Sequence, residues 1–331
     1  GVGYYPLNRI DGIRMSTALT FLEEARHRLN LTIKGDVTVK RVIFDGNKAT
    51  GVEAESGGEV FTVEASEVIL SGGAINSPQL LMPSGVGPAD HLIELGISVV
   101  SDLPGVGENL RDHQAIFLLF EAADIISREA PGLQVGMRYT TPDSEFRNDM
   151  QMRPLQVRTE HIPINFDYQG QGSPTGFSIA LQKPYTAGQL RLVSADPSDQ
   201  PKLDYRYLTD PRDRAKLRGA VRQCIELTES PAYKDYPLKR ISPDEDDLAS
   251  DDALDVWLRA NVMTQHHSSG TCKMGPDSDS MAVVNQYGRV RGIQNLRIVD
   301  ASIMPDCIRA NTNVTTMMIA ERVSDFIKDG K

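Results

Sequence analysis

The feature that most constrains the fold is a short apolar strand that ends in paired glycines. Residues 68–70 are Val-Ile-Leu, two glycines follow Ser71, and Ser77 and Pro78 then open a second apolar segment. Ser as N-cap followed by Pro at the first helical position predicts a strand-to-helix junction. The backbone can approach a ligand closely at such a junction, although the same residues also suit an ordinary tight turn. The chain therefore contains at least part of an α/β domain.

A second apolar strand lies near the other end of the chain. Residues 296–299 are Leu-Arg-Ile-Val, and Asp300 and Ala301 follow directly. Ligands of doubly wound α/β folds bind at the carboxyl ends of the strands. A helix is predicted after Asn313, and its first N–H groups could face an anion or an electron-rich ring. The two ends of the chain are thus expected to form one α/β domain.

The middle of the chain has a different pattern. Alternating apolar stretches between about residues 115 and 210 predict an antiparallel sheet, and helices are predicted from Asp210-Pro211 and over residues 254–262. We expect a mixed α/β fold in which a substrate domain of antiparallel sheet and helices is inserted. The predicted ranges are 1–114 and 259–331 for the Rossmann-like domain and 115–258 for the insertion.

Near the start of the chain, Ser16 predicts the beginning of a helix that runs to about Asn30, with one apolar face toward the core.

Composition excludes several classes of function. A net charge of −10 argues against a nucleic-acid partner. The sequence has no run of about 18 apolar residues, the length that a membrane-spanning helix needs. The acidic run 244–252 reads as a solvated loop, so no metal site is predicted. The first residues lack the pattern of a signal peptide. Three widely spaced cysteines predict free thiols in a reducing compartment, by default the cytoplasm.

Residues 265–276 hold the candidate chemistry: two adjacent histidines, His266 and His267, precede a glycine-broken turn, and asparagines follow downstream. Neutral imidazole is suited to take a proton from a hydroxyl near neutral pH. An Asn amide can hold the resulting alkoxide without titrating.

Five motifs in the same order as in one family carry a resemblance. The chain resembles the glucose-methanol-choline (GMC) flavoprotein oxidoreductases along almost its whole length. Residues 73–87 are similar to the second signature of the family, and residues 104–113 to its PGVGxNLxDH block. Substrate-domain landmarks lie at 194–197 and 207–211, and flavin-domain motifs lie at 267–275 and 299–305.

The resemblance implies the fold, FAD as cofactor and roles for particular residues. His267 stands at the catalytic histidine of the HxxGT motif, and Asn313 at the second catalytic position, which is His or Asn. His267 would act as general base, Asn313 would orient the alkoxide, and the hydride would pass to flavin N5. The FAD-binding positions that the resemblance implies are Val39, Asp300, Ala301 and Thr315.

Plainer interpretations remain beside these roles. His266 is interpreted as structural, although His266 and His267 could exchange roles. Cys272 lies inside the motif without a base pattern and is interpreted as inert packing. Asn311 could simply shape its loop, because Asn tolerates unusual backbone angles.

The chain also departs from the family pattern. It contains no G-x-G-x-x-G, and in the family that motif precedes the region matched here. We expect a missing segment, a second polypeptide or another part of a precursor, to supply it and to cover apolar faces. The stretch from Gln114 to Tyr185 is shorter than the resemblance leads us to expect, and Ala187-Gly188 replaces an Arg-Gly pair.

Three functions follow from these observations. The first is an FAD-dependent alcohol dehydrogenase or oxidase. The alternatives are a lyase of the hydroxynitrile lyase type on the same scaffold and a non-catalytic subunit. The substrate and the electron acceptor are not determined by these residues. A choline-type substrate would require an aromatic cage and a carboxylate, and the chain has one tryptophan, Trp257.

Overall fold

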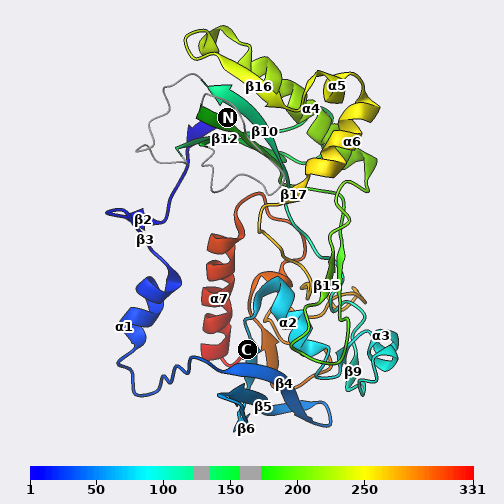
Figure 1. Ribbon diagram of the computed structural model, residues 1–331. Coiled ribbons are helices and arrows are strands. Elements are labelled where there is room, and N and C mark those ends of the chain that lie inside the picture. Colours follow the sequence, from blue (N-terminus) through cyan, green and yellow to red (C-terminus); the bar gives the residue numbers. More distant parts are fainter. Residues whose placement is uncertain (123–133, 157–172) are drawn as a thin grey trace.

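The computed structural model describes residues 1–122, 134–156 and 173–331. Figure 1 shows two parts, an upper sheet with helices beside it and a lower part of smaller sheets around the long helix α7 (Thr312–Lys328). Helix α7 begins beneath the upper sheet and runs down to the lower part, where the C-terminus lies. The loops that join the two parts therefore lie next to the start of α7.

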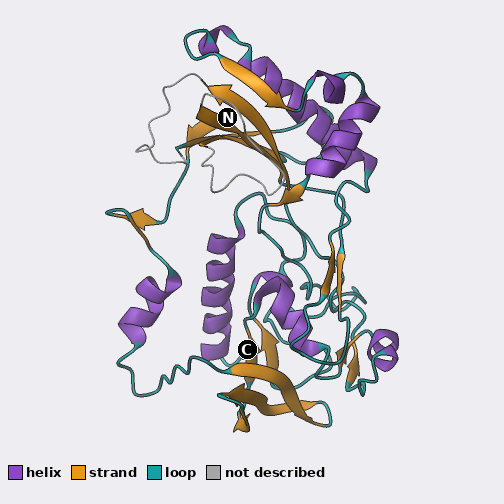
Figure 2. Ribbon diagram, viewed as in Figure 1, coloured by secondary structure: helices purple, strands orange, loops and turns teal. Residues whose placement is uncertain are grey.

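The upper part is a seven-stranded antiparallel sheet with helices on one face (Figure 2). Alternate side chains of its central strands, such as Ile116 and Leu118, pack against Leu217 and Leu258 of the helices. The predicted antiparallel sheet with helices is confirmed. In spatial order the strands are β1 (Val2–Tyr4), β11 (Val135–Tyr139), β12 (Met150–Gln156), β13 (Ser173–Leu181), β10 (Gln114–Ala122) and β16 (Leu238–Ser242), with β17 (Met263–Thr264) beside β10.

The predicted helix start at Asp210 is also confirmed. Asp210 caps α4 (Pro211–Thr228) by accepting a hydrogen bond from the Arg212 amide, and Pro211 occupies the first turn. The remaining helices of this part are α5 (Glu245–Leu248), α6 (Asp251–Asn261) and the short 3₁₀ helix η3 (Pro231–Tyr233).

The lower part contains the two apolar strands that the sequence predicts at residues 68–70 and 296–299. Strands β7 (Val68–Leu70) and β18 (Leu296–Ile298) pair in parallel, and their carboxyl ends lead to α2 (Gly73–Leu81) and to the 3₁₀ helix η4 (Ala301–Ile303). The predicted α/β core is confirmed in these elements. The other elements here are β4 (Thr38–Asp45), β5 (Lys48–Ser56), β6 (Glu59–Glu64), β8 (Val86–Gly87), α3 (Ala89–Glu94), β9 (Ser101–Asp102), β14 (Gln189–Arg191) and β15 (Lys202–Asp204).

The predicted start of α2 is wrong. The helix begins at Gly73, four residues before Ser77, and Pro78 lies inside it. Proline cannot donate to the carbonyl of Ala74 four residues earlier, and the Thr271 hydroxyl donates to that oxygen instead at 2.6 Å. Ser77 is not a cap because its hydroxyl accepts from the Gly72 amide at 3.0 Å and donates to Asp300.

The helix predicted from Ser16 to about Asn30 is present but shorter, and its core-facing stripe is wrong. A π-helical stretch, η1 (Ala18–Leu22), continues directly into α1 (Glu23–Ala25), after the small hairpin β2 (Arg9–Ile10) and β3 (Ile13–Arg14). Leu22 and Leu29, which belong to the predicted core face, are exposed. In Figure 1 this segment descends along the edge of the molecule. A short helix without a packed face is marginal in water.

The domain ranges derived from the sequence stay predictions. Two apolar clusters are present, one in each part, but β1 lies in the first predicted range and pairs with β11 of the upper sheet. Cys224, Cys272 and Cys307 are unpaired and buried. Among the described helices, none is both long and apolar enough to cross a membrane.

Candidate active site

Two antiparallel segments bring a pair of histidines together. Arg111 and Ser269 exchange backbone hydrogen bonds of 2.8 and 2.9 Å, and Gln114 pairs with Thr264 farther along. Between these pairs the Nδ1 atoms of His113 and His267 lie 2.8 Å apart. His266 has a positive φ of 61° and an exposed side chain. This backbone bend lets two adjacent histidines differ, so that His267 contacts His113 and His266 faces solvent.

The hydrogen bonds around His113 determine which nitrogens carry protons. Its Nε2 lies 2.7 Å from the carbonyl oxygen of Ile308, and a carbonyl can only accept. Burial lowers the pKa of His113 to about 3, so the ring is neutral. With the proton on Nε2, Nδ1 of His113 must accept from Nδ1–H of His267. His267 therefore has an unprotonated Nε2.

An asparagine lies against that unprotonated nitrogen. The Nδ2 atom of Asn311 is 3.0 Å from Nε2 of His267 and donates to it. Oδ1 of Asn311 accepts a 3.4 Å bond from the Tyr5 hydroxyl, which fixes the amide orientation. The side chain of Asn313 is exposed in the first turn of α7, and it makes no hydrogen bond within the described chain. The structure thus brings Asn311, two residues earlier than expected, to His267.

Asp112 holds the backbone of both histidines through hydrogen bonds. Its carboxylate accepts from the backbone amides of His113 and His267 at 2.8 and 3.0 Å and from the Tyr207 hydroxyl at 2.6 Å. Burial lowers the pKa of His267, and the negative charge of Asp112 partly opposes this effect. The imidazole of His267 is therefore neutral, and a buried carboxylate lies where it would stabilise an imidazolium if this ring accepted a proton.

The loop that carries the Ile308 carbonyl is fixed by charged contacts. Lys183 forms an ion pair with Asp306 and donates to the Cys307 carbonyl at 3.0 Å. Arg111 lies 3.6 Å from the same carboxylate. These contacts hold the peptide groups just before Ile308, so the acceptor for His113 is part of a rigid loop.

The residues implied for FAD lie on β4, at the start of η4 and on α7. Asp300 is buried, and it accepts from the amides of Gly73 and Ser302 at 2.9 and 2.7 Å. Its carboxylate thus shapes the two turns at the ends of β7 and β18. Val39 is partly exposed on β4, and Ala301 and Thr315 are half-buried.

This surface fits an electron-rich, partly anionic cofactor. A side chain at Gly73, which has a φ of 80°, would meet no atom within 4 Å, so the turn after β7 is open. Helix α7 has no side-chain cap and no acidic residue in its first turn, so its positive end is free of competing charge. Both observations agree with a group that binds at the strand ends.

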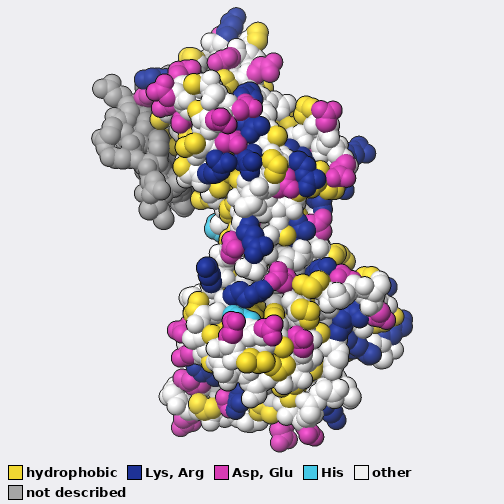
Figure 3. Space-filling view, turned by 90° about the vertical axis from the view of Figure 1, so that its right-hand side faces the viewer, with side chains coloured by type: hydrophobic (Ala, Val, Ile, Leu, Met, Phe, Trp, Pro, Cys, Tyr) yellow, Lys and Arg dark blue, Asp and Glu magenta, His cyan; other side chains and the backbone are white. Residues whose placement is uncertain are grey.

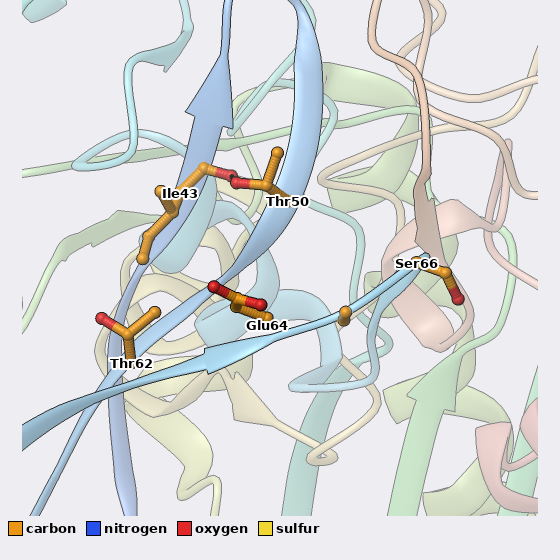
Figure 4. Close-up of a pocket in the computed structure, with 6 residues that line it drawn as sticks. Ile43, Thr50, Thr62, Glu64 and Ser66 are labelled. Atoms are coloured by element: carbon orange, nitrogen blue, oxygen red, sulfur yellow. Dashed lines mark hydrogen bonds between the residues drawn. The ribbon is translucent and has the colours of Figure 1, made fainter.

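Hollows elsewhere in the structure lack comparable chemistry. The one in Figure 4 lies on the three-stranded sheet. It contains neither histidine of the pair and no other imidazole or thiol. Its lining residues are Ile43, Thr50, Thr62, Glu64, Ala65 and Ser66.

Figure 3 shows the molecule narrowing between its two parts, with Lys and Arg side chains gathered around this waist. The histidine pair lies in the segments that join the parts.

Sequence reasoning missed three residues of this site. Asp112 and His113 lie in the block at 104–113, which was used only as a family landmark, and Asn311 was interpreted as a loop former. The adjacent Asp-His pair was the available signal. Nothing in the sequence distinguishes Asn311 from Asn313, because both lie beside the predicted start of the same helix.

Comparison with known proteins gives a consistent result. Models of the GMC oxidoreductase family match residues 1–115 and 184–320. The chain is 35% identical over 350 residues to an oxygen-dependent choline dehydrogenase of Photobacterium profundum and 37% identical over 354 residues to one of Ectopseudomonas mendocina. These alignments cover 98% and 99% of this chain and 61% and 62% of the relatives. The chain therefore spans less than two thirds of either relative.

Solved structures show the same likeness. Pyridoxine 4-oxidase from Mesorbium loti matches with a TM-score of 0.90 and 27% identity, over 98% of this chain and 64% of that one. Formate oxidase from Aspergillus oryzae matches with a TM-score of 0.83 and 23% identity, over 92% of this chain and 62% of that one, which shows the shared fold.

Proposed function

Because the chain belongs to the GMC oxidoreductase family, we propose that it is the catalytic part of an FAD-dependent enzyme that oxidises an alcohol to a carbonyl compound. The observation that carries the proposal is the unprotonated Nε2 of His267 with the Asn311 amide 3.0 Å away. A base and a hydrogen-bond donor side by side are what the removal of a hydroxyl proton requires, and the substrate hydroxyl would replace their direct hydrogen bond.

His267 is the general base in this proposal. The substrate hydroxyl enters between the two side chains, donates its proton to Nε2 of His267 and accepts a hydrogen bond from Nδ2 of Asn311. As the proton moves, the oxygen becomes more negative and the Asn311 bond strengthens. Asp112 stabilises the positive charge that develops on His267. Asn311 thereby takes the role that the sequence suggested for Asn313.

The cofactor supplies the hydride acceptor when it is bound. The predicted fold and FAD as cofactor are confirmed by the family assignment. The residues that would hold FAD are Val39, Ala301, Thr315 and the amides at the start of α7, with Asp300 shaping the turns beside them.

A further segment is needed to complete the FAD site. In the part of the chain that the structure describes, the parallel sheet formed by β7 and β18 has only these two strands. Parallel sheets normally have both faces covered by other elements. Ile69 on β7 is 45% exposed, and Val314 and Met318 on α7 are 68% and 54% exposed. We infer that a polypeptide segment with the phosphate-binding glycine motif packs here, in the same or in a second chain. The cytoplasmic location stays a prediction.

Anaerobic flavin absorbance tests the proposed reaction. The FAD-loaded enzyme, purified with its completing segment, is mixed with a panel of primary alcohols without oxygen. Substrate-dependent bleaching of the flavin is expected, because hydride transfer reduces it. Turnover of a cyanohydrin without bleaching would instead establish a lyase. A preparation that contains FAD and bleaches with no alcohol, and turns over no cyanohydrin, would contradict both activities.

A further inference from the structure

The sheet face nearest the histidine pair carries cationic and amide side chains. Met150 and Met152 of β12 lie in the apolar core, so Gln151 and Arg153 face the other way. Arg138 of β11 pairs directly with Gln151, and directly paired residues share a face. Two arginines on neighbouring strands therefore occupy the face opposite the helices.

This same face points toward the proposed base. Gln151 Nε2 donates to the Tyr5 hydroxyl at 2.7 Å, and that hydroxyl donates to Asn311 at 3.4 Å. Arg153 lies two residues beyond Gln151. Its positive charge lowers the pKa of His267, and that of Arg138 lowers the pKa of His113. Both guanidinium groups are thus within electrostatic reach of the imidazole pair.

Neither arginine has an acidic partner in the described chain. The Nε atom of Arg153 is buried and donates to no described residue, and Arg138 donates to the carbonyl of Arg309. Leaving a guanidinium partly buried without a counter-charge is unfavourable. A ligand that brings an anion would remove that cost, and the planar guanidinium suits oxyanions.

The two nearby carboxylates already have hydrogen-bond or ion-pair partners, which makes them less suited to a cationic substrate. Both oxygens of Asp112 are occupied by two amides and the Tyr207 hydroxyl, and Asp306 is paired with Lys183 and Arg111. Trp257 is buried on α6 and donates to Ser242, so it forms no part of an aromatic cage. The site thus presents two guanidinium groups without an acidic partner among the described residues, whereas Asp112 and Asp306 already have partners.

We propose that the substrate is an alcohol that carries an oxyanion group, a carboxylate or a phosphate, and that Arg153, with Arg138 beside it, binds this group while the hydroxyl lies between His267 and Asn311. The inference rests on the proposed alcohol oxidation and adds the substrate class. Arg153 is then the residue that determines specificity.

The test compares matched substrates on the FAD-loaded enzyme. Linear ω-hydroxycarboxylates of two to six carbons are compared with their neutral amides, with hydroxyalkyl phosphates of the same lengths and with hydroxyalkyl trimethylammonium cations, by the rate of anaerobic flavin reduction. We expect an anionic member to exceed its neutral match in kcat/KM by about tenfold or more, because hydrogen bonds to a charged group are stronger than those to a neutral one. Whichever of the carboxylate and phosphate substrates has the higher kcat/KM identifies the oxyanion group that the site prefers.

Variants assign the preference to a residue. Arg153→Gln should raise KM for the anionic substrate about tenfold and leave the neutral amide unchanged, with Arg153→Lys in between. Arg259→Gln on α6, behind the sheet, is the control and should change neither. Arg138→Gln is a second variant if Arg153→Gln fails to fold. Equal rates for acid and amide, or an equal loss for both with a shifted pH profile, would show that Arg153 only tunes His267.

A binding measurement separates this inference from the proposed reaction. Butanoate, which cannot be oxidised at a hydroxyl, is titrated into wild type and Arg153→Gln by calorimetry, with butanamide as the neutral control. Butanoate binding that disappears in the variant supports the oxyanion site even if no alcohol reduces the flavin. Flavin reduction by neutral or cationic alcohols alone, with no butanoate binding, would overturn the inference while the oxidation stands.

Discussion

The surroundings of His267 and the strand ends below it differ in how far their groups find partners within this chain. At the imidazole pair, His113 is bonded on both nitrogens and Asp112 accepts three hydrogen bonds. At the strand ends the turn at Gly73 is open, and on α7 Val314 and Met318 are exposed. The proton-transfer groups are therefore ordered by this chain alone, whereas the cofactor surface is not. Proton transfer and cofactor binding should thus be separable by mutation.

The largest effect is expected from the base. His267→Gln removes the proton acceptor, and flavin reduction by an alcohol should slow about a thousandfold, since a positioned base contributes roughly 10²–10⁴. Rapid-mixing absorbance of the anaerobic enzyme measures it. His266→Gln is the matched control because its side chain is exposed, and we expect a change of less than about threefold. Similar losses in both variants would contradict the assignment.

The two asparagines provide the next comparison. Asn311→Ala removes the amide that holds the alcohol oxygen, and kcat/KM should fall about a hundredfold. Asn313→Ala removes an exposed side chain and should cost less than about threefold. Steady-state kinetics with the same alcohol decides between them. The reverse order would return the role to Asn313.

The pH dependence has a definite sign. Burial places the pKa of His267 below its ordinary value of 6.5, so the base is neutral above that pH. The rate of flavin reduction should be flat above about pH 6.5 and fall tenfold per unit below the lowered pKa, as protonation removes the acceptor. A profile that rises toward acid would exclude a neutral imidazole base.

A smaller effect is expected at His113. His113→Leu removes the acceptor for Nδ1–H of His267, and the rate should fall about tenfold, the equivalent of one neutral hydrogen bond. His113→Asn keeps an acceptor near the same position and should retain most of the rate. Nitrogen-15 NMR of the imidazoles checks the cause: wild type and His113→Asn should show the proton on Nδ1 of His267. The same tautomer in His113→Leu would show that His113 does not set it.

The smallest effect concerns the exposed face. Val314→Ser together with Met318→Ser should change the free energy of unfolding of this chain by less than about 0.5 kcal/mol per site. The buried Leu258→Ala should cost about 2–5 kcal/mol. Urea unfolding gives both values. The serine pair should nevertheless lower the flavin content of the assembled enzyme, and unchanged flavin content would argue against a segment that packs there.

Sequence patterns predicted the elements whose signals are local. Strands β7 and β18 and the start of α4 follow from apolar runs and capping residues. The helix expected over residues 16–30 forms only over residues 18–25, and its apolar stripe has no packed partner in the described structure. The start of α2 failed because Ser77 bonds to Asp300, which is 223 residues away. Such long-range contacts have no local signature.

The same distinction explains the site. His267 was predicted because the motif at 267–275 is contiguous. Asn311 could not be separated from Asn313, because the choice depends on where α7 begins relative to the histidine. His113 was missed as a functional residue because its importance depends on the Ile308 carbonyl, 195 residues away. Both contacts depend on tertiary structure.

The chain of hydrogen bonds from His267 through His113 to the Ile308 carbonyl cannot carry a proton away from His267. A carbonyl cannot take up a proton. Nδ1 of His113 accepts a hydrogen bond, but the pKa of about 3 makes it a poor base, so it does not take the proton itself. A proton that His267 receives at Nε2 cannot leave through the back of the ring. It must depart by the side from which the substrate came. In the proposed oxidation, discharge of the proton and departure of the carbonyl product therefore share one exit, and the site can bind a new alcohol only after both have left.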